Sequence, residues 1–167
     1  MTVVSAICNS FKQEILVGTH NFTNGTNTFK LALFSSDSAS LSKSTTAYAA
    51  PSDANAKPTS THEVSQKTTD GGATATGYDA GGKALTASAD PVLSTDTACV
   101  KFNDLSWTSA SFTARGCLIY NSTAVTGFTT NRAVCAVNFG ADKTVTSGTF
   151  TVQFPAQTAG NAIVQIA

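Results

Sequence analysis

Charged side chains are scarce in this sequence, since they make up 12% of its 167 residues and cancel to a formal net charge of zero. An average soluble domain carries about twice that fraction, roughly 25%. A surface with so little charge produces a weak long-range field, which argues against binding to nucleic acid or to anionic lipid. Hydroxyl groups take the place of charges, because the sequence contains 18 Ser and 27 Thr. Neutral surfaces associate readily, and this favours a protein whose working state is an assembly.

Long apolar runs are also missing, because no stretch approaches the roughly 20 apolar residues of a membrane-spanning helix. The first residues contain neither the basic segment nor the unbroken apolar segment of a secretory signal peptide. We therefore expect no membrane partner and synthesis in a reducing cytoplasm. The length is sufficient for one domain with a substantial core, so we predict a single domain over residues 1–167.

Closely spaced cysteine pairs are absent. The four cysteines are Cys8, Cys99, Cys117 and Cys135, and no two of them have the spacing of a metal-binding or redox motif. Three of them lie in strand-like runs beside Val, Leu and Ile, which predicts buried free thiols that behave as small apolar side chains. A disulfide between Cys117 and Cys135 is the alternative if their strands pair.

Catalytic and metal-binding motifs are equally scarce. His62 and Glu63 are adjacent, but the second histidine of an HExxH zinc motif does not follow them. We expect His62 and His20, the only other histidine, to be solvated loop residues. The aspartates show neither the pairing of a glycosidase nor the spacing of a calcium-binding loop. We therefore predict no enzyme activity, no metal and no cofactor.

Secondary-structure patterns are what the sequence does contain. Apolar residues at helical spacing predict an amphipathic helix over about residues 4–17, and Gly18 can provide the left-handed residue that ends it. We expect its apolar stripe to cover the chain's own sheet, with docking on a neighbouring protein as the alternative. Alternation of Phe29, Leu31 and Leu33 predicts the first strand.

The second half of the chain, about residues 83–167, is rich in short alternating strands. Phe150, Val152 and Phe154 alternate with polar residues, as in a strand with one buried face. The expected strands are 83–89, 98–102, 105–108, 114–120, 132–139, 144–146, 149–154 and 162–166. Turn residues such as Ser147-Gly148 are expected to form hairpin corners between them. This pattern predicts a mainly all-β fold, an antiparallel β-sandwich or jelly roll with one N-terminal amphipathic helix and a long irregular loop. The predicted core consists of Phe29, Leu31, Leu33, Val100, Phe102, Trp107, Leu118, Val137, Phe139, Phe150, Val152 and Phe154.

The irregular loop covers about residues 35–82, which are mostly Ser, Thr, Ala, Asp and Gly. A loop of this length in a compact domain is commonly functional. We therefore expect its large side chains, Tyr48, Val64 and Tyr78, to anchor contacts with neighbouring subunits of an assembly. Deletion of residues 49–61 is expected to leave the β-domain folded and to weaken attachment to the assembly.

Two arginines, Arg115 and Arg132, lie at or near the starts of strand-like runs. A partly buried arginine needs an acidic or carbonyl partner. An internal salt bridge is one interpretation of each, and a contact with a neighbouring subunit is the other. Under the second interpretation both residues join the candidate interface.

Several segments resemble a family of bacteriophage virion structural proteins. They are NSFKQEIL (9–16), TFKLALFS (28–35), STTAY (44–48), GYDAGGKALT (77–86), WTSASFTARGCLIYN (107–121) and VNFGADKTVT (137–146). The resemblance is greatest to small capsid decoration, or cement, proteins of tailed phages. It implies a non-catalytic component of the virion on the capsid surface, which binds the major capsid protein and itself as a homotrimer, with neither nucleic acid nor membrane as a partner. The alternative is a tail-associated or fibre-like protein that binds a host glycan, with Tyr48 and Tyr78 stacking on the sugar.

Overall fold

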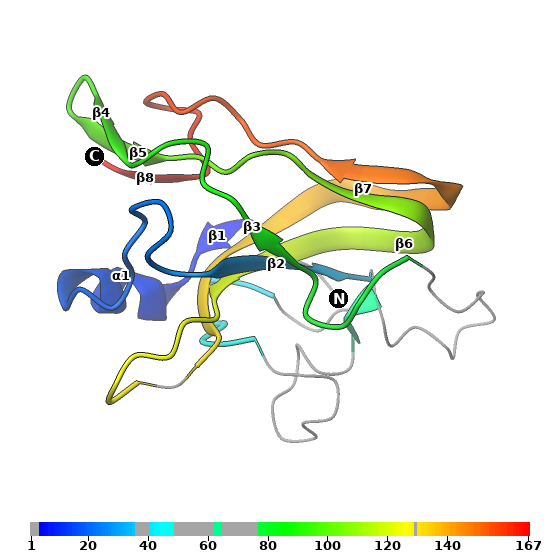
Figure 1. The fold of residues 1–167 in the computed structure, drawn as a ribbon, viewed down its shortest axis with the longest axis horizontal. Coiled ribbons are helices and arrows are strands. Elements are labelled where there is room, and N and C mark those ends of the chain that lie inside the picture. Colours follow the sequence, from blue (N-terminus) through cyan, green and yellow to red (C-terminus); the bar gives the residue numbers. More distant parts are fainter. Residues whose placement is uncertain (1–3, 36–40, 49–61, 65–76, 129) are drawn as a thin grey trace.

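The computed structural model describes residues 4–35, 41–48, 62–64, 77–128 and 130–167 (Figure 1). The fold is mainly β, with two antiparallel sheets and one short helix, and it forms the predicted sandwich. One sheet has the strand order β1-β7-β6-β2-β3 and the other the order β4-β5-β8. The elements are β1 (Ala6–Ile7), α1 (Asn9–Leu16), β2 (Phe29–Phe34), β3 (Lys83–Leu85), β4 (Val92–Ser94), β5 (Thr97–Val100), β6 (Leu105–Asn121), β7 (Arg132–Val152) and β8 (Val164–Ile166).

Strands β6 and β7 form one long hairpin that bends back over the larger sheet (Figure 1). Pairing runs from Leu105 opposite Val152 to Asn121 opposite Arg132, with register shifts on the way. Bulges of this kind bend a strand pair without ending it. The bend is at the register shifts after Trp107, where Ser109 and Ser147 have φ angles of 51° and 49°.

The prediction of several separate strands in this region was therefore wrong. The ranges 105–108 and 114–120 both belong to β6, and the ranges 132–139, 144–146 and 149–154 belong largely to β7. Ser147 lies inside β7 and makes no hairpin corner; its backbone N–H donates to Ser111 Oγ at 2.8 Å. The residues that interrupt the alternation are bulge residues, and pairing continues on both sides of them.

Helix α1 is shorter than predicted, because Ala6 and Ile7 pair with β7 as strand β1. The helix begins at Asn9 and packs against β7 of the same chain, with Phe11 as its buried residue. Its stripe thus covers the chain's own sheet. The last helical residue, Leu16, points away from this contact and is 85% exposed.

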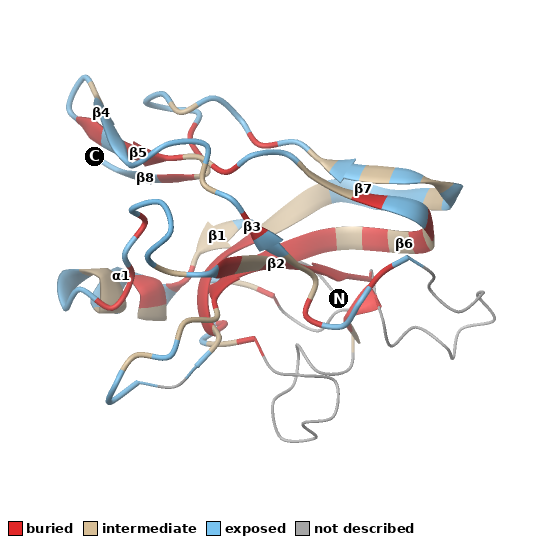
Figure 2. Cartoon of the chain, in the orientation of Figure 1, coloured by how far each residue is buried: buried red, intermediate tan, exposed pale blue. Residues whose placement is uncertain are grey.

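The core draws residues from both sheets, and residues 31–34 of β2 are all buried, so both faces of this strand are covered (Figure 2). Buried members of the predicted set are Phe29, Leu31, Leu33, Val100, Phe102, Trp107, Leu118 and Phe154. Half-buried members are Val137, Phe139, Phe150 and Val152. The strand phase is correct, since the polar residues between Phe150 and Phe154 are exposed. Three of these half-buried residues, Phe139, Phe150 and Val152, line an open groove along β7.

All four cysteines are free and buried, as predicted. Cys117 pairs with Val137 and Cys135 pairs with Ile119, so the two thiols are diagonal neighbours on adjacent strands. Burial raises the pKa of the Cys117 thiol to about 12. At neutral pH this thiol is protonated and acts as an apolar side chain.

Truncation of Phe154 and of Phe150 should have unequal costs. Phe154 is 8% exposed and packs edge-on against Phe102, so Phe154→Ala should lower the free energy of unfolding by about 3–5 kcal/mol. Phe150→Ala should cost less, about 1–3 kcal/mol, because that ring already contacts solvent. Urea denaturation of both variants measures the difference. Equal costs would contradict the difference in burial described for these two rings.

Candidate functional site

The residues predicted as an interface do not form an exposed cluster. Tyr48, Val64 and Tyr78 are 6%, 1% and 8% exposed and belong to the chain's own core. Glycan stacking on Tyr48 and Tyr78 loses its support, because a buried ring offers no face to a sugar. Residues 49–61, the proposed attachment insert, lie outside the described residues.

The two arginines make internal ion pairs of different kinds. Arg115 Nη1 lies 3.5 Å from Asp142 Oδ1, and both side chains are partly exposed to solvent. Arg132 is 1% exposed, and its Nε lies 3.5 Å from Glu14 Oε2. Its guanidinium also lies 5.3 Å from the centre of the Phe128 ring. Arg132 therefore belongs to the interior of the fold.

Glu63 holds the buried tyrosines in place. Its side chain is fully buried, and its Oε1 accepts hydrogen bonds from Tyr78 Oη at 2.8 Å and Gly81 N at 2.6 Å. Its Oε2 accepts a hydrogen bond from Tyr48 Oη at 2.9 Å. Burial of a carboxylate is costly without such donors, and hydrogen bonds to a charged acceptor are stronger than neutral ones. We call Glu63 and these three partners the Glu63 clamp.

The Glu63 clamp is joined to strands β2 and β6. The backbone N–H of Leu33 donates to Tyr78 Oη at 2.8 Å, and Tyr120 Oη donates to Gly81 O at 2.8 Å. The rings of Tyr48 and Tyr120 stack with centroids 4.6 Å apart. Burial, with the charge of Glu63 acting in the same direction, raises the pKa of the Tyr48 and Tyr78 hydroxyls, so both remain donors.

A glycine turn completes the connection between the clamp and β2. Gly82 has a φ of +65°, and a Cβ there would lie 1.8 Å from Leu31 O. Only glycine can occupy this position without moving β2. The described parts of the irregular segment are thus packed into the chain's own core. The sequence had predicted instead that they contact a neighbouring subunit. The residue that the sequence analysis missed is Glu63. It is a single glutamate in a polar segment, and nothing in the sequence around it indicates that it is buried.

A second buried polar network surrounds His20. This histidine is 5% exposed, so the expectation of a solvated loop residue was wrong. Its Nε2 lies 2.6 Å from Glu14 Oε2, and its Nδ1 lies 3.2 Å from Asn121 Nδ2. Arg132 approaches the same Glu14 oxygen. The network therefore connects α1, the segment after it, the end of β6 and the start of β7.

The end of α1 explains why His20 reaches Glu14. Gly18 has a φ of +73°, as predicted for the residue that ends the helix. The Gly18 N–H donates to Ile15 O at 3.2 Å, and the Thr19 N–H donates to Glu14 O at 3.0 Å. This pair of bonds is a Schellman motif, which turns the chain back along the last helical turn. His20, the next residue, consequently lies beside the Glu14 side chain.

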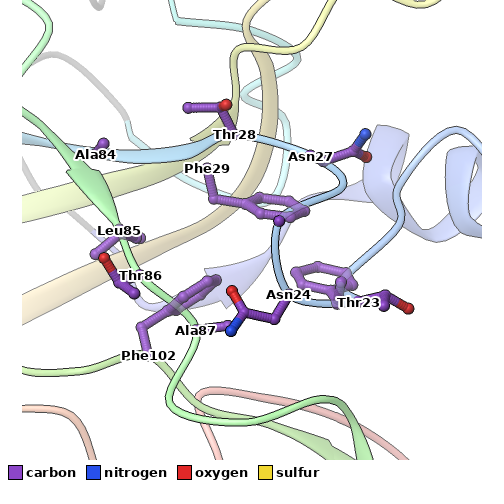
Figure 3. Close-up of a pocket in the computed structure, with 12 residues that line it drawn as sticks. Thr23, Asn24, Asn27, Thr28, Phe29, Ala84, Leu85, Thr86, Ala87 and Phe102 are labelled. Carbon is purple, nitrogen blue, oxygen red and sulfur yellow. The ribbon is translucent and has the colours of Figure 1, made fainter.

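A pocket of about 250 Å³ lies between residues 22–28 and the segment around β3 (Figure 3). Its lining includes the rings of Phe22 and Phe29, which stack with centroids 4.3 Å apart, and the ring of Phe102. Asn24 and Thr86 lie on opposite sides of the opening (Figure 3). The pocket thus has an aromatic floor and a polar rim.

The smaller sheet carries an exposed apolar row. Leu93 pairs with Ala98, and Ala98 pairs with Ile166, so the three side chains lie side by side on one face. Leu93 is 73% exposed and Ile166 is 52% exposed. Strands β4, β5 and β8 contain no charged residue, and β4 and β8 are the edges of this sheet. We call Leu93, Ala98 and Ile166 the apolar row.

Removal of the clamp carboxylate should destabilise the fold strongly. Glu63→Ala leaves two tyrosine hydroxyls and the Gly81 N–H buried without this acceptor, and each such loss costs about 1–3 kcal/mol. We expect a total loss of about 3 kcal/mol or more in chemical denaturation. The matched control is Asp142→Ala, which removes an exposed acid and should change stability by less than about 1 kcal/mol. Equal effects of the two substitutions would show that the clamp does not stabilise the fold.

Within the described part of the chain, no group of three or more His, Cys, Asp or Glu residues is arranged to hold a metal ion. No helix among the described residues is long and apolar enough to cross a membrane. Comparison with known proteins finds no matching family model, no similar curated protein and no similar solved structure.

Proposed function

We propose that this chain is a structural protein of a bacteriophage particle, which binds the major capsid protein as a homotrimer and reinforces the shell. The proposal rests on the resemblance to phage virion proteins. The observation from the fold that supports it is the uncharged small sheet with its exposed apolar row. Its site of action is the outer surface of the capsid.

The segments that carry the resemblance belong to one part of the fold. Segment 9–16 is α1, 28–35 contains β2, 77–86 contains β3, 107–121 lies in β6 and 137–146 lies in β7. Segment 44–48 joins the same sheet, because Ala47 forms a bridge with Arg132. The resemblance therefore describes the five-stranded sheet and its helix. Strands β4, β5 and β8 lie outside the resembling segments. This is expected if these strands make the contact with the capsid shell that this protein decorates.

The small sheet has the properties of a docking surface. An exposed apolar row beside open strand edges is a liability for a monomer in solution, because it invites association. In a particle component the same features are useful, since apolar side chains and backbone edges can meet a shell subunit. We assign the apolar row to the contact with the major capsid protein.

The mechanism of reinforcement is mechanical. A trimer that bridges neighbouring shell subunits adds buried surface at each junction, and a specific contact buries roughly 1,000 Å² or more. Many identical contacts act together, so a modest contact is sufficient at each position. The uncharged strands of the small sheet favour contacts that salt does not screen.

A charge in the apolar row should abolish decoration without unfolding the protein. Leu93→Asp places a carboxylate at a residue that is 73% exposed, so the fold should tolerate it while the buried contact does not. The matched control is Thr149→Asp, an exposed strand position on β7. Co-sedimentation with capsids that lack the protein measures occupancy. We expect loss of occupancy for Leu93→Asp only, and wild-type occupancy of this variant would contradict the assignment.

The trimer should be detectable directly. Sedimentation equilibrium at micromolar concentration should give three times the 17.1 kDa of one chain, or the protein should be trimeric on the particle. Monomers in both settings would contradict the proposed oligomer.

A further inference from the structure

The hydrogen bonds around His20 have a fixed direction. The Asn21 N–H donates to Asn27 Oδ1 at 2.8 Å, so this oxygen is an acceptor. Asn121 Nδ2 donates to the same oxygen at 3.0 Å, and the Thr123 N–H donates to Asn121 Oδ1 at 3.0 Å. A backbone N–H can only donate, so two backbone groups fix the orientation of both side-chain amides.

This direction determines which nitrogen of His20 carries the proton. Asn121 Nδ2 points its hydrogen at His20 Nδ1 over 3.2 Å, so Nδ1 must accept and carries no proton. Nε2 carries the proton and donates to Glu14 Oε2 at 2.6 Å. Neutral His20 thus satisfies both of its neighbours. A second proton, on Nδ1, would point at the Asn121 NH₂ group, so two donors would face each other.

Rotation of the Asn121 amide does not relieve this conflict. The rotated oxygen would face Asn27 Oδ1, which is an acceptor held by the Asn21 N–H. The rotated NH₂ group would face the Thr123 N–H, which is a donor. The network therefore accepts His20 in one protonation state only.

The charged groups that face His20 are Glu14 from α1 and Arg132 from β7. Burial lowers the pKa of His20 from its ordinary value of 6.5, Glu14 raises it and Arg132 lowers it, and the net direction is downward. Glu14 compensates only in part, because Arg132 Nε lies 3.5 Å from the same carboxylate oxygen. The electrostatic surroundings and the hydrogen-bond direction thus favour the same neutral state.

We propose that His20 is a proton-operated latch, which holds α1 and residues 18–28 on the sandwich when neutral and releases them when Nδ1 is protonated. The latch joins α1 and the segment before β2 to the paired ends of β6 and β7. Glu14 lies on α1, Asn27 lies in the segment before β2, and Asn121 and Arg132 lie at the β6 and β7 ends of the long hairpin.

Release would uncover aromatic surface. Phe11 is 3% exposed, and its ring centroid lies 4.9 Å from that of His20. Phe22 is 8% exposed and stacks on Phe29 at 4.3 Å. Because residues 22–28 line one side of the pocket in Figure 3, release would also open that pocket towards Phe102.

The sign of the pH dependence follows from the direction of the shift. The released state binds the proton more readily than the latched state, because the pKa of His20 is lower in the latched state. The latched state is therefore most stable above pH 6.5, and its stability falls as pH drops below that value. One proton weakens it by at most about tenfold for each pH unit.

Amide hydrogen exchange between about pH 8 and pH 5 tests the latch in the intact protein. Protection factors, corrected for the intrinsic exchange rate, are measured for residues 11–22 and for the paired centre of β6 and β7. His20→Gln is the test variant, since a glutamine amide can donate to Glu14 and accept from Asn121 but does not titrate. His62→Gln is the matched control, because it removes the other histidine.

We expect the wild type and His62→Gln to lose protection in residues 11–22 as pH falls, while β6 and β7 keep theirs. His20→Gln should keep its protection across the same range. Parallel loss in the wild type and in His20→Gln would overturn the proposal, as would constant protection in the wild type. The NMR titration of the His20 ring in the wild type needs no variant. A ring that titrates at or above 6.5 would also overturn it.

Discussion

The continuous pairing of β6 with β7 is the interaction on which the rest of the structure depends. These strands lie at the centre of the larger sheet, with β1 on one side and β2 and β3 on the other. Their bend at Ser109 and Ser147 turns the far half of the hairpin back over the sheet, so that Trp107 reaches the core. Both polar networks lie where β6 ends and β7 begins, because Tyr120 contacts the Glu63 clamp and Arg132 belongs to the His20 network.

The two networks fasten segments that apolar burial alone would hold weakly. Ordering each residue costs about 1–2 kcal/mol of backbone entropy, and segments rich in Ser, Thr and Gly bury little area in return. Glu63 and His20 offset this cost with buried hydrogen bonds, which are strong when every partner is present and costly when one is missing. The sandwich therefore depends on two buried polar side chains, Glu63 and His20, and the sequence suggested a solvated loop residue at the second of them.

The sequence was sufficient to predict the sandwich, the apolar phase of Phe150 and Phe154, and the buried thiols, because these depend on local alternation. Gly18 was predicted for the same reason, since a helix end is a local feature. The Glu63 clamp was missed because its partners are 15 and 18 residues away in the chain. The continuity of β6 and β7 was missed because a bulge and a turn use the same residue types.

Under the proposed function, this neutral sandwich with its uncharged small sheet would lie at every junction of the capsid shell. Copy number per virion is the decisive measurement, because a shell component occurs at every shell junction and a tail component occurs at one site on the particle. Quantitative mass spectrometry of purified particles, with the major capsid protein as internal reference, gives the number. A protein that decorates the shell should be present in hundreds of copies in each particle. A dozen copies or fewer would place the protein in the tail and contradict the proposed function.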